Sequence, residues 1–74
     1  REVESAELGE AISQWLRSLP NEDRVLFVRR YWYAVPLNEL AKECGIAPKK
    51  LAQRMYRLRL SLKKFLEKEG IFNA

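Results

Sequence analysis

The stretch Leu37–Leu60 reads LNELAKECGIAPKKLAQRMYRLRL, and its pattern predicts two helices separated by a tight turn. The apolar residues before Gly45 form a stripe only two turns long, so we expect a short helix over 37–44. A glycine after such a stripe favours a left-handed stop to the helix. Proline suits a first helical turn, so the second helix is expected to run from Pro48 to about Lys68.

The long helix has two different sides. Its apolar residues recur at spacings of four, three, four and three, which is typical of a helix side buried against a partner; they are Leu51, Met55, Leu58, Leu62 and Phe65. On a helical wheel the opposite side carries polar and basic residues, namely Lys49, Lys50, Gln53, Tyr56 and Arg57, extended by Lys63 and Lys64. Arg54 lies on the shoulder of this face, and Leu60 is a lone apolar residue within it.

Two further helices are expected upstream, at about 6–18 and 20–33. The first carries apolar residues at three- and four-residue spacing: Leu8, Ile12, Trp15, Leu16 and Leu19. The second contributes Val25, Leu26, Val28 and Trp32, with Phe27 and Tyr31 beside them. No strand-like alternation is long enough to compete. The sequence therefore predicts an all-α fold, a small four-helix domain that contains a helix-turn-helix and ends in a long recognition helix.

The polar face has the chemistry of a nucleic-acid reader. Lysine donates to guanine acceptors or phosphates, glutamine pairs with adenine, arginine pairs with guanine, and tyrosine contacts a sugar or a thymine methyl group. The net charge is +4, but residues 1–24 carry −3 and residues 25–74 carry +7. Residues 48–64 include seven bases and no acid. Such a block indicates a polyanion partner, although a solvated helix face gives the same pattern.

Other classes of protein are disfavoured. A single cysteine, Cys44, and the lack of histidine leave no disulfide, zinc site or catalytic dyad, so we interpret Cys44 as a small buried apolar residue. No nucleophile or phosphate-loop motif occurs, and we expect no enzyme, catalytic residue, cofactor or metal. No apolar run approaches the roughly 18 residues of a membrane span, which predicts a cytoplasmic protein without a membrane or small-molecule partner. Residues 1–74 are expected to form one domain, cut from the C-terminal end of a longer protein, with residues 1–5 flexible.

Three quoted segments resemble region four of bacterial RNA polymerase sigma factors, especially the extracytoplasmic-function type: LPNEDRVLFVRRYWY (19–33), LNELAKECGI (37–46) and KKLAQRMYRLRLSLKKFLEKEG (49–70). The resemblance covers roughly 8–70. Its strongest elements are Leu19-Pro20 with Arg24, Arg30-Tyr31-Trp32, Glu39-Leu40-Ala41 before Gly45-Ile46, and Arg54, Arg57 and Arg59.

The resemblance implies a bacterial transcription-initiation domain that binds the upstream (−35) element of double-stranded promoter DNA, while its flank holds the flap of the polymerase β subunit. The base-facing positions of the family correspond to Lys49, Lys50, Ala52, Gln53, Tyr56 and Arg57. The backbone amides of Leu37 and Asn38 would hold phosphate, and Arg54, Lys63 and Lys64 complete the expected DNA-binding set. An anti-sigma protein stays open as a further partner.

The chain departs from the family pattern at three positions. Pro36 and Ala47 replace the Ser or Thr that usually caps the two helices of the motif, and Ala52 replaces a residue that is often basic. Two alternatives stay open, and these departures are the reason for the second of them. One is a different helix-turn-helix regulator that binds its site as a dimer without polymerase. The other is a sigma-like protein-interaction module that has lost DNA binding.

Two clusters near residue 30 also have two interpretations. Tyr31-Trp32-Tyr33 resembles a base-stacking platform, but we expect packing in the core or in an interface because these residues end an amphipathic helix. Arg29 and Arg30 either contact phosphate or face solvent.

Overall fold

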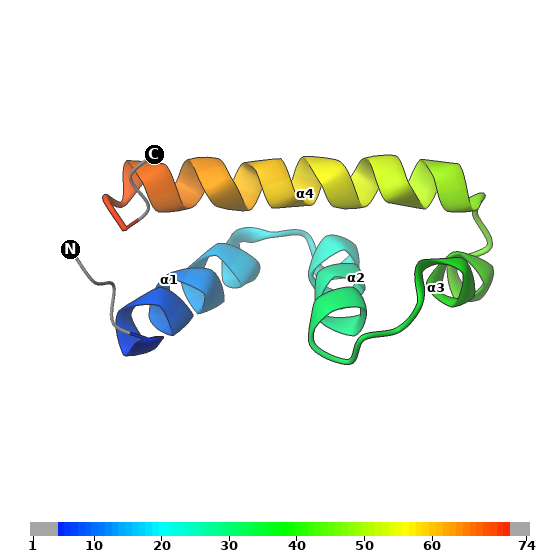
Figure 1. Ribbon diagram of the computed structural model, residues 1–74, viewed down its shortest axis with the longest axis horizontal. Coiled ribbons are helices and arrows are strands. Elements are labelled where there is room, and N and C mark those ends of the chain that lie inside the picture. The colour runs from blue at the N-terminus through cyan, green and yellow to red at the C-terminus, as the bar shows by residue number, and fades with distance from the viewer. Residues whose placement is uncertain (1–4, 72–74) are drawn as a thin grey trace.

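The computed structural model describes residues 5–71, and this part of the chain forms four α-helices and no strand. The helices are α1 (Ser5–Ser18), α2 (Asn21–Tyr31), α3 (Leu37–Cys44) and α4 (Pro48–Lys68) (Figure 1). The predicted all-α helix-turn-helix fold is confirmed, and the bounds of α3 and α4 are as predicted. Helix α2 is shorter than predicted at both ends. The expected flexibility of residues 1–4 lies outside the described residues, and Ser5 is the first residue of α1.

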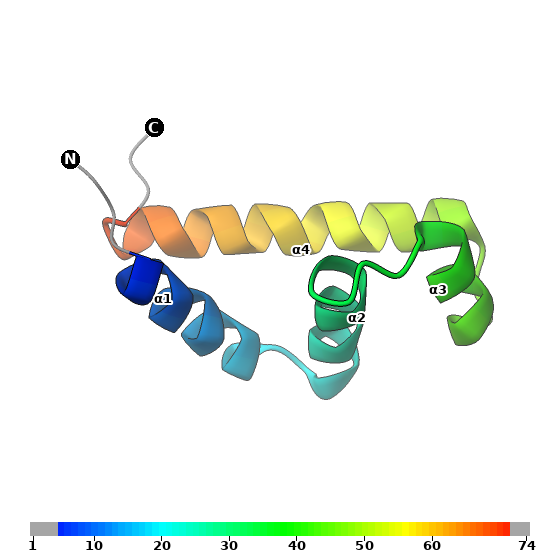
Figure 2. The ribbon, with the colours of Figure 1, turned by 60° about the horizontal axis from the view of Figure 1, so that its bottom comes forward.

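Helix α4 is the longest helix, and the other three pack against it. It runs along the longest dimension, and α1, α2 and α3 all lie along one side of it (Figures 1 and 2). The molecule measures 41 × 20 × 20 Å, and 21 helical residues span about 31 Å at a rise of about 1.5 Å each. Among residues 5–71, no helix lies along the other side of α4, which therefore faces solvent along its length.

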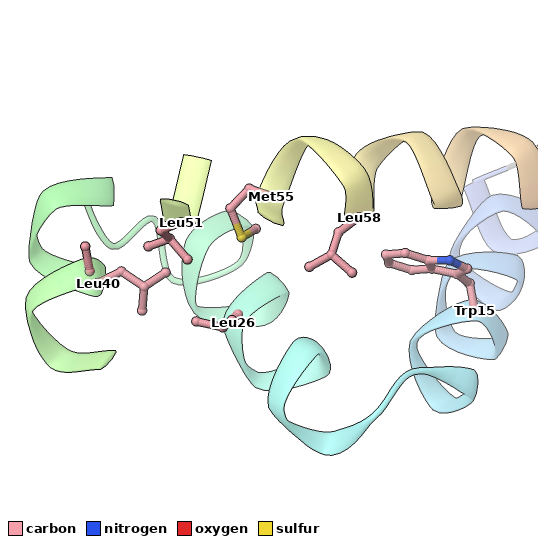
Figure 3. Close-up of a cluster of buried hydrophobic side chains, with 7 residues drawn as sticks. Trp15, Leu26, Leu40, Leu51, Met55 and Leu58 are labelled. Carbon is pink, nitrogen blue, oxygen red and sulfur yellow. The ribbon is translucent and has the colours of Figure 1, made fainter. Parts of the chain in front are cut away.

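The core is one cluster that follows the inner side of α4 (Figure 3). Leu51 and Met55 are completely buried, and they meet α3 and α2 through Leu40 and Leu26. Farther along, Trp15 of α1 is buried and its indole Nε1 donates to the Ser61 hydroxyl at 3.1 Å. The predicted buried stripe is therefore confirmed at its first three positions, Leu51, Met55 and Leu58, whereas Leu62 and Phe65 are half-buried and Leu66 is buried in addition.

The turn between α3 and α4 forms as the sequence predicts. Gly45 adopts the left-handed conformation, with φ 67° and ψ 31°. Its amide donates to the carbonyl of Lys42 at 3.2 Å, and the amide of Ile46 donates to the carbonyl of Ala41 at 3.1 Å. These bonds satisfy the last carbonyls of α3, and they bring Ile46 against the core. The turn thereby fixes how α3 and α4 meet.

The connection between α2 and α3 contains a strained residue. Ala34 has a φ of 55°, in the left-handed region that disfavours any residue with a Cβ atom. Backbone bonds hold it there from both sides: the amide of Tyr33 donates to the carbonyl of Val28 at 3.2 Å, and the amide of Val35 donates to the carbonyl of Arg29 at 3.0 Å.

The prediction that Cys44 is a small buried residue is wrong. Cys44 is exposed, because α3 buries Leu40 and Ala41 and ends at Cys44, after which Ile46 is the residue that packs inward. Trp32 and Tyr33 lie outside the core, since they are 81% and 68% exposed, and packing in an interface with a partner stays a prediction for them. Trp32 lies past the last residue of the shortened α2, at its C-cap position. Two more of the predicted apolar residues, Leu8 and Val25, are likewise exposed.

Candidate nucleic-acid interface

The outer side of α4 presents the predicted polar face. The first turns of α4 expose all six of the residues expected to read bases, namely Lys49, Lys50, Ala52, Gln53, Tyr56 and Arg57. Between them, Leu51 and Met55 are buried, at 0% and 1% exposure. These two side chains hold the first turns of α4 against the core. The structure thus brings the six positions together on the rigid N-terminal half of one helix. Their roles in DNA binding stay predictions.

The two helices of the motif begin without side-chain caps. Pro36 precedes α3 and Ala47 precedes α4, and neither forms a side-chain capping hydrogen bond. The first intrahelical bond of α3 runs from the amide of Leu40 to the carbonyl of Pro36 at 3.0 Å, so helix geometry leaves the amides of Leu37 and Asn38 without an intrahelical acceptor. A phosphate oxygen is a good partner for such amides.

Arg54 has acidic partners from another helix. Its Nε donates to Oδ1 of Asp23 at 2.8 Å, and its Nη2 donates to Oε1 of Glu22 at 3.1 Å. Nη2 also lies 2.6 Å from Oδ1 of Asp23. The hydrogen bond to Asp23 is the main cause of a raised Arg54 pKa, and burial acts in the opposite direction. Glu22 and Asp23 both lie in the first turn of α2.

Asp23 and Arg54 also line an open hollow beside the polar face. The hollow has a volume of about 510 Å³, and its lining includes Lys50, Gln53 and Arg57. One carboxylate therefore lies among the residues that are expected to meet DNA, a juxtaposition that helical periodicity alone did not reveal.

Arg29 and Arg30 make contacts within the domain that the sequence did not reveal, and their contact with phosphate stays a prediction. Nη2 of Arg29 lies 2.7 and 2.9 Å from the two carboxylate oxygens of Glu43, which ties α2 to α3. Arg30 lies over the ring of Tyr31 at 5.6 Å and makes a long hydrogen bond of 3.4 Å to the carbonyl of Val35. Both side chains thus have partners within the domain.

Lys63 and Lys64 are exposed but distant from the first turns of α4. At about 1.5 Å per residue, Lys63 lies about 21 Å along the helix from Lys49. Between them, Arg59 donates to the hydroxyl of Tyr31 at 2.6 Å. A helix that inserts its first turns into a groove therefore keeps Lys63 and Lys64 away from the base edges.

The α1–α2 side of the molecule has a different character. An apolar hollow of about 510 Å³ lies there, lined by Gly9, Ile12, Ser13, Leu16, Phe27, Val28, Tyr31 and Trp32. Trp32 forms part of it although it lies outside the core. Ile12, Leu16, Phe27 and Val28 were expected from the sequence on apolar sides of helices, but the hollow between them was not.

Residues 5–71 contain no group of three or more Cys, Asp or Glu side chains that is arranged to hold a metal ion. No helix among them is long and apolar enough to cross a membrane.

A short helix, a glycine turn and a long helix whose basic side is free define a helix-turn-helix domain of the DNA-binding class. The family model described as Sigma-70, region 4 matches residues 9–62, and the chain belongs to this family. A comparison with curated proteins gave no match. The family supplies the part of sigma factors that binds the −35 promoter element in transcription initiation, and it is a DNA-binding regulatory domain rather than an enzyme.

Proposed function

We propose that the chain is the promoter-recognition domain of a sigma factor of the extracytoplasmic-function type, and that it binds the −35 element of bacterial promoters in the cytoplasm. The observation that carries this proposal is the free outer side of α4, with its first turns fixed by Leu51 and Met55. Residues 1–74 act as a single domain of a longer sigma factor in this proposal.

Base reading is assigned to the first two turns of α4. Gln53 lies at the centre of the face and is the residue best suited to discriminate adenine. Lys50 and Arg57 lie on one edge of it, and they meet guanine or phosphate. Lys49, Ala52 and Tyr56 complete this surface, and Ala52 contributes no charged contact.

Phosphate binding is assigned to the uncapped start of α3. The amides of Leu37 and Asn38 point along the axis of α3 toward its free N-terminal end, where the helix dipole favours an anion. Lys63 and Lys64 lie too far along α4 for base contact, so they act at the flank of the duplex through long-range attraction.

The polymerase contact is assigned to the opposite, α1–α2 side. The resemblance implies the β-subunit flap as the partner. The apolar hollow lined by Leu16, Phe27 and Trp32 is the proposed binding site for it. Because this hollow lies away from the polar face of α4, the domain is able to hold polymerase and DNA at once. An anti-sigma protein that covered the hollow would compete with polymerase and leave DNA binding intact.

A selection from a random duplex library tests the proposal. The domain, alone and bound to polymerase core enzyme, is expected to enrich one short motif, more strongly in the presence of polymerase. Enrichment of a palindromic site by a dimer without polymerase would instead identify a different helix-turn-helix regulator. Binding of core enzyme with no enrichment and no salt-dependent DNA affinity would identify an interaction module.

A further inference from the structure

We propose that Arg54 is a positioning residue for DNA binding: it neutralises Asp23 and Glu22 beside the polar face of α4 and does not itself contact phosphate. The inference rests on the proposed DNA-binding function and concerns how the polar face keeps its positive potential. It assigns to Arg54 a role different from the direct contact that the sequence pattern suggested.

The contacts show that Nε and Nη2 of the guanidinium already have carboxylate partners. Both Nε and Nη2 of Arg54 point at Oδ1 of Asp23, and Nη2 is shared with Glu22. The Arg54 side chain is 34% exposed and that of Asp23 is 22% exposed, so the pair is partly buried between α2 and α4. A phosphate would have to compete with two carboxylates for the same fork of donors.

The position of Asp23 explains why neutralisation matters. Its carboxylate lines the same hollow as Lys50, Gln53 and Arg57. A bare carboxylate at this place would repel the phosphates that approach the polar face, and at about 0.1 M salt this repulsion extends over about 10 Å. Arg54 therefore removes a negative charge from the DNA-binding surface.

Arg54 gains from the arrangement as well. Lys50 lies four residues before it and Arg57 three residues after it, spacings at which like charges on a helix repel each other. Asp23 and Glu22 offset this repulsion and leave Lys50 and Arg57 as the cations that face outward. The same contacts fix the start of α2 against α4.

The test compares binding of the 74-residue chain to a random-sequence duplex at several salt concentrations. We expect Arg54→Gln to weaken DNA binding about fivefold, because the carboxylates of Asp23 and Glu22 lose their cationic partner and then repel nearby phosphates. The triple change Glu22→Gln, Asp23→Asn and Arg54→Gln should restore binding to within about twofold, with the salt slope of the unaltered chain. Arg17→Gln removes an exposed base on α1 and serves as the matched control, with a loss of less than about twofold.

Three results would overturn the inference. One is a triple variant that binds DNA as weakly as Arg54→Gln and has a log–log salt slope smaller by about 0.9 than that of the unaltered chain. Such a decrease in slope indicates the loss of one phosphate contact. Another is weaker binding by Glu22→Gln with Asp23→Asn when Arg54 is intact. This double variant keeps the test decisive if Arg54→Gln does not fold, because uncovering a cation should tighten binding. An unaltered chain that shows no affinity for DNA would overturn the inference together with the proposed function, whereas failure of the rescue alone leaves that function standing.

Discussion

Replacing Ala34 with glycine should stabilise the domain, because Ala34 holds a left-handed conformation with φ 55°. For a residue with a Cβ atom this conformation costs about 1–2 kcal/mol. Glycine removes that strain. It also raises the entropy of the unfolded chain, which lowers the stability of the folded domain by about 0.5–1 kcal/mol. Ala34 is exposed, so the lost methyl group gives up no burial, and the flanking backbone bonds from Tyr33 and Val35 are unaffected.

The net expectation for Ala34→Gly is a gain of about 0.5–1 kcal/mol in the free energy of unfolding, or about 3–6 °C in Tm for a domain of this size. Urea and thermal unfolding followed by circular dichroism measure both quantities. The matched control is Ala52→Gly, the same change at an exposed position inside α4, which should lower stability by about 0.5–1 kcal/mol. An Ala34→Gly domain that is no more stable than the unaltered chain would refute the strain argument.

Three further changes separate the roles of individual residues. Ala47→Ser should add a side-chain cap to α4 and raise stability by about 0.5–1 kcal/mol in urea unfolding; an unchanged midpoint would mean that the free amides of α4 are already satisfied. Gln53→Ala should change the base preference recovered by duplex selection rather than weaken all sites equally, and recovery of the same motif would count against its reading role. Lys63→Ala combined with Lys64→Ala should weaken DNA binding less than Lys50→Ala combined with Arg57→Ala, as measured by fluorescence anisotropy, because the former pair lies about 21 Å from Lys49 along the helix. Equal losses would place the duplex along the whole of α4.

The sequence was sufficient to predict where most elements begin and end. The stop at Gly45, the start at Pro48 and the buried positions Leu51 and Met55 follow from local rules, because each depends on residues within a turn or two. The exposure of the first turns of α4 followed from the same periodicity. The Sigma-70 region 4 family was also accessible, since its motifs lie in continuous segments.

The remaining features depend on residues that are far apart in the chain. A helical wheel gives the side on which Arg54 lies but cannot show that Asp23, 31 residues earlier, lies opposite it. The same holds for Arg29 and Glu43. Trp32 was misplaced for a related reason: its spacing matched the apolar residues of α2, but the helix ends before it.

The positive φ of Ala34 was not foreseen, because alanine gives no local signal for that conformation.

The most direct test of DNA binding by α4 is the salt dependence of duplex binding by the Lys50→Ala and Arg57→Ala variants, measured beside Arg17→Ala on the remote helix α1. If the outer side of the first turns of α4 meets DNA, each of the two variants should bind more weakly, and the log–log salt slope should shrink by about 0.9 for each phosphate contact that is removed. Arg17→Ala should keep the slope of the unaltered chain. Unchanged affinity and slope in both the Lys50 and Arg57 variants would contradict the assignment of this face to DNA.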